Sequence, residues 1–277
     1  TQRSTLFPYT TLFRSPQYYI DQVKKMFLSV PGQSHSEGYY TGLLLLQNAY
    51  PKFAVKVTRS GTPEGPVTSY LRAAGTMWGD LDHATGWQYG IDTWDWAGGE
   101  PFDYTYSPAQ AARVTTGLSY AHNNGFTVSA IGYGYCYNEG YVTSYITATQ
   151  YFLDYCTEHN LPTKVFFTTG PADSHLSKAD EESYNSYLRW KAIREHVAED
   201  PTRILFDYND ILSYNDAGIQ QTKTWNGHNF PVIHPDNMLG DTDVWPAGHI
   251  GGNGCLRLGK AMWWMLARIA GWDGQSK

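Results

Sequence analysis

Apolar and polar segments alternate along the chain in a way that predicts strands taking turns with helices. Short apolar runs of strand length recur, and longer segments with apolar residues at helical spacing lie between them. The predicted strands are 26–30, 53–58, 126–131, 164–169 and 203–206. The predicted helices are 37–50, 108–123, 141–159, 181–199 and 254–271. This alternation predicts an α/β fold, a three-layer sandwich in which helices cover both faces of a central parallel sheet.

Two long segments show neither the strand-like nor the helical spacing of apolar residues. Residues 64–107 are rich in Gly, Trp and Asp and follow a turn-rich loop at 59–63, whereas 214–248 are loop-like throughout. Long segments of this kind in a folded domain are usually functional insertions. We therefore expect one domain over residues 16–277, with an insertion at about 64–107.

The composition restricts the kind of partner. The 277 residues carry a formal net charge of −6 and no polybasic cluster, which argues against nucleic acid and against an anionic membrane surface. The longest apolar run, residues 43–46, is too short for a membrane span. Aromatic residues make up 16% of the chain, a content that suits either sugar stacking or an aromatic core. We expect a small-molecule or polysaccharide partner, and the oligomeric state stays open.

The cysteines give no sign of a metal or redox site. Cys136, Cys156 and Cys255 lack the Cys-x-x-Cys spacing, so neither a zinc site nor a disulfide framework is predicted. A glycine-rich loop ending in Lys-Ser or Lys-Thr, as used for phosphate, is also missing from the sequence. We expect no cofactor.

The first residues are expected to lie outside the native fold. Residues 3–15 read RSTLFPYTTLFRS, which is what an in-frame translation of a widely used sequencing adapter gives. We therefore treat 1–15 as an adapter artefact in a gene assembled from metagenomic reads. The expected localisation is secreted or periplasmic in a bacterium, with the signal lost from the chain.

A serine follows the first predicted strand in Gly32-Gln33-Ser34-His35-Ser36. Such a serine can act as a nucleophile if a base removes its proton. The plainer alternative is that Ser34 caps the next helix, because Gly-x-Ser is common before helices.

A candidate base stands far along the chain at His249, just before Gly251, Gly252 and the last predicted helix. A neutral imidazole on this loop can serve as general base, and an exposed loop histidine is the alternative. His234 is the main rival, but it lies in the middle of a loop, whereas His249 precedes a helix that holds it.

Further polar groups follow later predicted strands. Gly61 and Asn138 come after the second and third strands, and the carboxyl ends of parallel strands share one edge of the sheet. The N–H groups of Ser34 and Gly61 and the side-chain amide of Asn138 are therefore candidate donors to the oxyanion formed when Ser34 attacks a carbonyl.

These residues resemble the blocks of the SGNH/GDSL hydrolases over residues 26–271. Gly32-Gln33-Ser34 is similar to the Gly-Gln-Ser form of block one in carbohydrate O-acetyl esterases of that family. Ser60-Gly61 resembles the second block, residues 134–138 the third, and His249 with Gly254 the fifth. The resemblance implies a flavodoxin-like sheet, Ser34 as nucleophile, His249 as base, and Ser34, Gly61 and Asn138 as the oxyanion hole.

Two positions depart from the family pattern. The third block has a different spacing before Asn138, and Pro246 stands where the family places an aspartate, three residues before the histidine. Asp243 is our candidate for the acid that orients His249. Asp241 or a backbone carbonyl are the alternatives.

The segment 78–100 contains Asp92, Asp95 and other acidic residues, together with Trp94 and Trp96. Without fixed ligand spacing it is better explained as a polar loop with aromatic anchors than as a metal site or a glycosidase pair. We expect Trp94 and Trp96 to bind substrate, together with Gln33 and His35 beside Ser34.

The sequence therefore predicts a serine esterase that hydrolyses an acyl ester on a carbohydrate. A non-catalytic carbohydrate-binding protein on the same scaffold is the alternative, because fold does not confer activity. A glycoside hydrolase or lyase that uses the acidic 78–100 segment is a third hypothesis.

Overall fold

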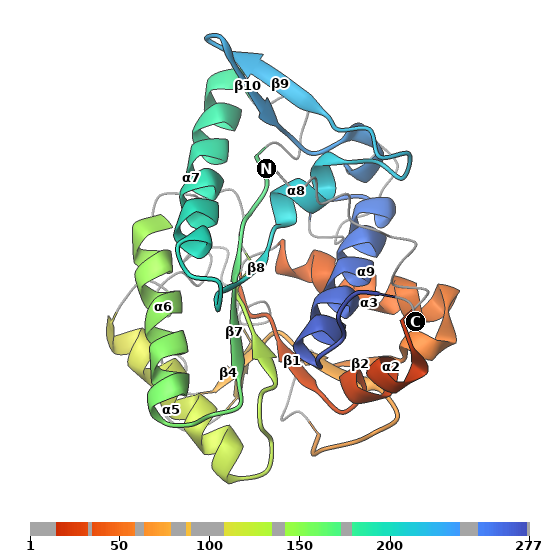
Figure 1. Ribbon diagram of the computed structural model, residues 1–277, viewed down its shortest axis with the longest axis vertical. Helices are drawn as coiled ribbons and strands as arrows, with labels where there is room; N and C mark the ends of the chain where they lie inside the picture. The colour runs from red at the N-terminus through yellow and green to blue at the C-terminus, as the bar shows by residue number, and fades with distance from the viewer. Residues whose placement is uncertain are drawn as a thin grey trace.

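A six-stranded parallel sheet forms the centre of the folded protein (Figure 1). The computed structural model describes residues 15–32, 35–58, 64–78, 87–89, 108–134, 142–172, 179–238 and 249–275. The sheet strands are β1 (Phe27–Ser29), β2 (Val55–Thr58), β3 (Leu71–Ala74), β6 (Ala130–Ile131), β7 (Lys164–Thr168) and β8 (Ile204–Phe206). Their order across the sheet is β2-β3-β1-β6-β7-β8, and every neighbouring pair is parallel.

The five predicted strands are all present, and the α/β prediction is confirmed. Without β3, their order is that of a flavodoxin-like sheet. β3 is inserted between β1 and β2 and comes from the segment predicted to be an irregular insertion, so that prediction is wrong for residues 71–74. Its sequence, Leu-Arg-Ala-Ala, contains no β-branched or aromatic residue, which is why its local pattern did not indicate a strand.

Helices form a layer on each face of the sheet, as predicted (Figure 1). α2 (Gln17–Val23), α3 (Ser36–Ala49) and α9 (Gly252–Ile269) lie on one face. α5 (Pro108–Asn123), α6 (Val142–Glu158) and α7 (Asp180–Ala198) lie on the other. The five helices predicted from periodicity are present within two residues at each end. α2 was not predicted.

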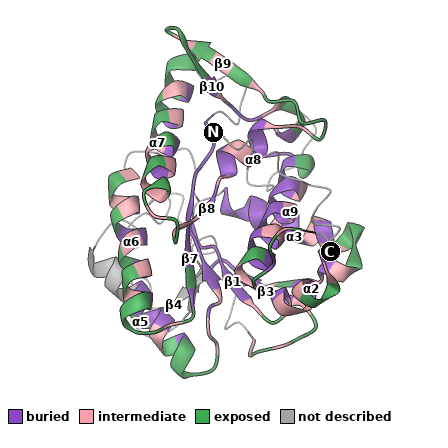
Figure 2. Ribbon diagram, in the orientation of Figure 1, coloured by how far each residue is buried: buried purple, intermediate pink, exposed green. Residues whose placement is uncertain are grey.

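The strands divide their side chains between the two layers. Phe27 packs into the cluster beneath α5–α7, while its neighbour Leu28 packs into the cluster beneath α3 and α9. Phe166 and Phe167 of β7 alternate in the same way. Because successive side chains of a strand point to opposite faces, a sheet buried on both sides needs apolar residues at consecutive positions. Figure 2 shows the resulting buried centre and the exposed outer faces of the helices.

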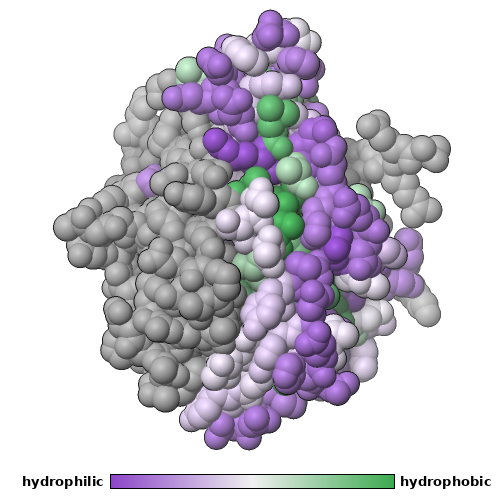
Figure 3. All heavy atoms as spheres, turned by 90° about the vertical axis from the view of Figure 1, so that its left-hand side faces the viewer, coloured by the Kyte–Doolittle hydropathy of each residue, from purple (hydrophilic) through white to green (hydrophobic). Residues whose placement is uncertain are grey.

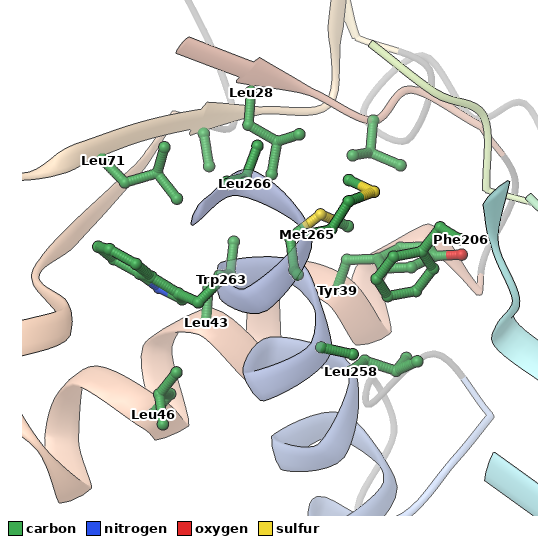
Figure 4. Close-up of a cluster of buried hydrophobic side chains, with 14 of the residues drawn as sticks. Leu28, Tyr39, Leu43, Leu46, Leu71, Phe206, Leu258, Trp263, Met265 and Leu266 are labelled. Carbon is green, nitrogen blue, oxygen red and sulfur yellow. The ribbon is translucent and has the colours of Figure 1, made fainter. Parts of the chain in front are cut away.

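α3 and α9 approach each other closely through glycines. A Cβ at Gly42 would lie 1.9 Å from the carbonyl oxygen of Cys255, and one at Gly259 would lie 2.3 Å from that of Gly42. Around this crossing, Leu43 and Leu46 of α3 and Leu258, Trp263 and Leu266 of α9 lie in one apolar cluster (Figure 4). The cluster fixes α9, and with it the residues that immediately precede the helix.

The second segment predicted to be a loop also contains regular structure. β9 (Thr222–Trp225) and β10 (His228–Pro231) form an antiparallel hairpin, so the loop prediction for 214–248 is wrong there. Asn226 and Gly227 both have positive φ at its turn, +46° and +79°. Asn-Gly between two runs is a strong hairpin signal, and it could have been used. β4 (Thr76–Trp78) and β5 (Trp87–Tyr89) pair antiparallel within the 64–107 segment.

Short helices complete the described fold. They are η1 (Pro51–Phe53), α8 (Tyr208–Ser213) and η2 (Pro235–Asn237). Viewed from the side of α6 and α7, the described residues are mostly hydrophilic, with an apolar strip in the middle (Figure 3). Within the described ranges, no helix combines the length and hydropathy needed to cross a bilayer.

Candidate active site

The carboxyl ends of the parallel strands share one edge of the sheet, and two predicted site residues are described there. These are His35, which follows β1, and His249, which precedes α9. The other predicted site residues lie outside the described residues: Gln33, Ser34, Gly61, Trp94, Trp96, Asn138 and Asp243. Their roles stay predictions, and the geometry below concerns the residues that surround them.

The chain that leaves β1 touches the chain that leaves β6. Gly32 and Gly134 form an isolated parallel bridge, and the Gly134 N–H donates to the Pro31 carbonyl at 3.0 Å. Gly32 has a φ of +149°, and a Cβ there would lie 2.4 Å from the Gly134 oxygen. A Cβ at Gly134 would meet Ser36 at 2.4 Å. Glycine is needed at both positions because the two backbones and the start of α3 meet here.

α3 starts two residues after the predicted nucleophile. α3 begins at Ser36, and its N-cap position falls on His35, whose backbone is helical (φ −66°, ψ −17°). The His35 side chain makes no cap hydrogen bond. The alternative in which Ser34 caps α3 concerns a residue outside the described ranges, so it stays a prediction.

The rings of His35 and His249 are in contact. Their centroids are 4.9 Å apart and their planes are tilted by 33°. His35 is fully buried, whereas His249 is partly exposed. The predicted base is thus brought from the far end of the sequence against the residue that follows Ser34.

The backbone of His249 has an uncommon conformation and is anchored by the residues that follow it. Its φ is +59°, in the left-handed region, which costs a residue with a Cβ on the order of 1 kcal/mol. Ile250 forms an isolated bridge with Met238, and the Gly251 N–H donates to the Asn237 carbonyl at 3.0 Å. These contacts set the direction in which the His249 side chain leaves the loop.

His234, the alternative candidate for the base, has a structural role in its own loop. His234 occupies the N-cap of η2, where its Nδ1 accepts a hydrogen bond from the Asp236 N–H at 3.1 Å. That nitrogen also lies 3.5 Å from the Asp236 carboxylate. The capping contact accounts for His234 without a catalytic role.

A polar cluster at the end of β8 was missed in the sequence. Arg194 binds the Asp207 carboxylate through Nε to Oδ2 at 2.6 Å and through Nη2 to Oδ1 at 2.8 Å. The Thr169 hydroxyl donates to the same Oδ1 at 2.8 Å and accepts from the Asn209 N–H at 3.0 Å. Asp207 directly follows a predicted strand, and that position was the available signal.

Two charged groups of this cluster have shifted pKa values. Burial alone would lower the pKa of the Arg194 guanidinium, but the Asp207 carboxylate outweighs it and the pKa is raised. The pKa of Asp210 is raised from 3.8 to about 6, first by burial and second by the neighbouring Asp207 charge. Asp210 is thus the carboxyl group in this cluster whose charge changes in the mildly acidic range.

The cluster is joined to the histidine pair through Tyr208. The buried Tyr208 ring meets His35 edge to face, with centroids 6.0 Å apart and planes at 75°. Tyr208 directly follows Asp207, whose carboxylate also accepts from the Asp210 N–H and caps α8. In the described part of the chain, no group of three or more His, Cys, Asp or Glu side chains lies close enough to hold a metal ion.

Two solved structures are similar to this chain at low identity. One is the C-terminal catalytic domain of peptidoglycan O-acetyltransferase A from Streptococcus pneumoniae, with a methylsulfonyl adduct, at 10% identity and a TM-score of 0.38 over 90% of this chain and 96% of that one. The other is a carbohydrate esterase family 2 enzyme with a carbohydrate-binding domain from Corynascus thermopiles (Myceliophthora fergusii), at 12% identity and a TM-score of 0.38 over 90% and 67%. No protein-family model matches the chain, and no curated protein matches it significantly. The fold assignment therefore rests on the topology of the chain itself.

Proposed function

We propose that this chain is a serine esterase of the SGNH hydrolase type, which hydrolyses an acyl ester on a carbohydrate through a covalent acyl-enzyme. The observation that carries the proposal is the ring contact between His35 and His249. It unites the loop that holds the proposed nucleophile with the proposed base, although the two are far apart in the sequence.

In the first half of the reaction, the Ser34 hydroxyl oxygen attacks the ester carbonyl carbon while His249 takes the hydroxyl proton. The negative charge passes to the carbonyl oxygen, which we assign to donors from the Ser34 N–H, the Gly61 N–H and the Asn138 amide. The tetrahedral intermediate then collapses, the bond between the acyl carbon and the sugar oxygen breaks, and His249 gives its proton to that leaving oxygen.

In the second half, water attacks the acyl-Ser34 ester and again loses its proton to His249. Collapse of the second intermediate releases the carboxylic acid and returns the proton to Ser34. We assign Asp243 as the acid that orients His249, and Gln33, Trp94 and Trp96 as substrate contacts.

The test compares three variants on p-nitrophenyl acetate and on an acetylated polysaccharide. Ser34→Ala and His249→Gln should each lower kcat/KM by at least about 1,000-fold. His234→Gln is the matched control, because it removes a histidine that only caps η2, and its kcat/KM should stay close to that of the original chain. Hydrolysis by Ser34→Ala at the original rate would reject the proposed nucleophile.

A fluorophosphonate probe distinguishes the proposal from the non-catalytic alternative. An activated serine forms a covalent adduct that mass spectrometry locates on Ser34, whereas a binding protein gains no mass. The third hypothesis makes the opposite prediction to ours, namely that Ser34→Ala is harmless and that replacing Asp92 or Asp95 abolishes turnover.

A further inference from the structure

We infer that His35 is a positioning residue, whose buried ring sets the orientation of the His249 imidazole and is itself supported by contact with Tyr208. This inference rests on the proposed function, since it assigns a task to a residue of the same site. It gives His35 a role that acts through the base, in place of the direct substrate contact expected from the sequence.

The burial of His35 favours an indirect role. Its relative exposure is 0%, so its ring is enclosed by protein groups, whereas His249 retains access to solvent. A general base must reach the proton that it removes, and the partly exposed ring of the pair suits that task. The enclosed ring suits support of its neighbour.

His35 also belongs to a row of ring contacts that leads to the sheet. Tyr208 meets His35 edge to face at 6.0 Å, and Tyr39 meets Tyr208 at 5.9 Å with planes at 65°. Tyr39 in turn contacts Phe206 of β8 at 5.3 Å. Edge-to-face pairs prefer particular angles. The successive ring contacts from Phe206 through Tyr39 and Tyr208 therefore restrain the His35 ring relative to the sheet.

Charged hydrogen bonds hold Tyr208 in place. It is the first residue of α8, and Asp207 before it is bound by two Arg194 donors and the Thr169 hydroxyl. Arg194 lies on α7 and Thr169 follows β7, so side chains from two separate segments converge on this one carboxylate. Charge-assisted and bidentate bonds are shorter and more directional than neutral ones.

The backbone conformation of His249 explains why a contact to its ring matters. Its positive φ fixes where the side chain starts, and the Ile250–Met238 bridge anchors the following residue. His35 is a described neighbour in contact with the His249 ring, with the two ring centroids 4.9 Å apart. Loss of the His35 ring would remove a contact that limits rotation of the imidazole, and small misplacements of a catalytic group are costly.

The test uses His35→Leu, which keeps apolar bulk but lacks a ring, and His35→Phe, which restores a ring. We expect kcat to fall about 100-fold in His35→Leu with KM within about twofold, and to recover to within about threefold of the original value in His35→Phe. Phe53→Leu is the matched control. It removes another buried ring, at the end of η1, whose centroid lies 5.2 Å from that of Trp263, and kcat should be unchanged.

A second readout is independent of turnover. In histidine-labelled protein, the ring proton signals of His249, identified by their loss in His249→Gln, should shift in His35→Leu and stay in place in Phe53→Leu. Unshifted His249 signals, an undiminished kcat in His35→Leu, or a His35→Phe variant as slow as His35→Leu would each overturn the inference. If the original chain neither hydrolyses esters nor reacts with fluorophosphonate, the proposed function fails, and the ring proton signals still decide whether His35 orients His249.

Discussion

Arg194 holds the Asp207 carboxylate with two N–H donors, at 2.6 and 2.8 Å, and thereby ties the C-terminal part of α7 to the end of β8. Both side chains are largely shielded from solvent, with exposures of 23% and 16%. Bidentate pairing in such surroundings is stronger than an ion pair in water, and either partner is costly to remove alone.

Replacing Arg194 with Gln should therefore lower the free energy of unfolding by about 2–3 kcal/mol, measured by urea denaturation. The reason is that the Asp207 charge remains partly buried without its main partner. Lys191→Gln is the control on the same helix, since its pair with Glu195 is exposed on both sides and should matter by less than about 0.5 kcal/mol. Equal losses in the two variants would contradict the assigned importance of the Asp207 pair.

The raised pKa of Asp210, about 6, makes a prediction for stability against pH. Because the folded pKa lies above the ordinary 3.8, the folded state binds the proton more tightly than the unfolded state. The carboxylate therefore costs stability increasingly as pH rises from about 4 to about 6, and the full cost persists above that range. Asp210→Asn should be more stable than the original chain near neutral pH, by about 1–2 kcal/mol, and this gain should disappear below about pH 4.

Asp200 supplies a control of opposite sign for that experiment. Hydrogen bonds from the Thr202 backbone N–H, and then from its hydroxyl, lower the pKa of Asp200. Its charged form thus contributes stability that is lost as pH falls, and Asp200→Asn should destabilise the protein near neutral pH. A pH-independent effect of Asp210→Asn in thermal melts would contradict the shift.

The contact between Gly42 and the backbone of α9 predicts a severe effect of one methyl group. In Gly42→Ala the new Cβ would lie 1.9 Å from a carbonyl oxygen in α9, so the two helices must separate and the apolar cluster around them must open. We expect a loss of at least about 3 kcal/mol in unfolding free energy. Gly252→Ala, where a Cβ would meet nothing within 4 Å, should be neutral or stabilising by up to about 1 kcal/mol. A mild Gly42→Ala variant would show that the helices are not in contact there.

Burial raises the pKa of the Cys156 thiol to about 11. Near pH 8 only about one molecule in a thousand would carry the reactive thiolate at this position. In a Cys136→Ser background, iodoacetamide should therefore leave both Cys156 and the buried Cys255 unmodified in the folded protein. Mass spectrometry should find both alkylated after denaturation in guanidinium chloride, and rapid native alkylation of Cys156 would contradict its burial.

Local patterns in the sequence predicted most of the regular structure. The apolar run of β7 and the helical spacing of apolar residues in α9 can each be recognised within one short stretch of sequence. Five strands and five helices were predicted from such local signals. β3 and the β9–β10 hairpin were missed for different reasons. Leu71–Ala74 becomes a strand because two neighbouring strands hold it, whereas the hairpin had a local Asn226–Gly227 signal that the loop prediction overlooked.

By itself, the sequence determined the α/β class and the parallel sheet, because both depend on the period and order of apolar residues along the chain. The tertiary structure decided that His35 meets His249, that Tyr208 supports His35, and that Arg194 and Thr169 converge on Asp207. These contacts join residues from separate helices and strands. They form only when both helical layers have packed on the sheet, so no local pattern encodes them.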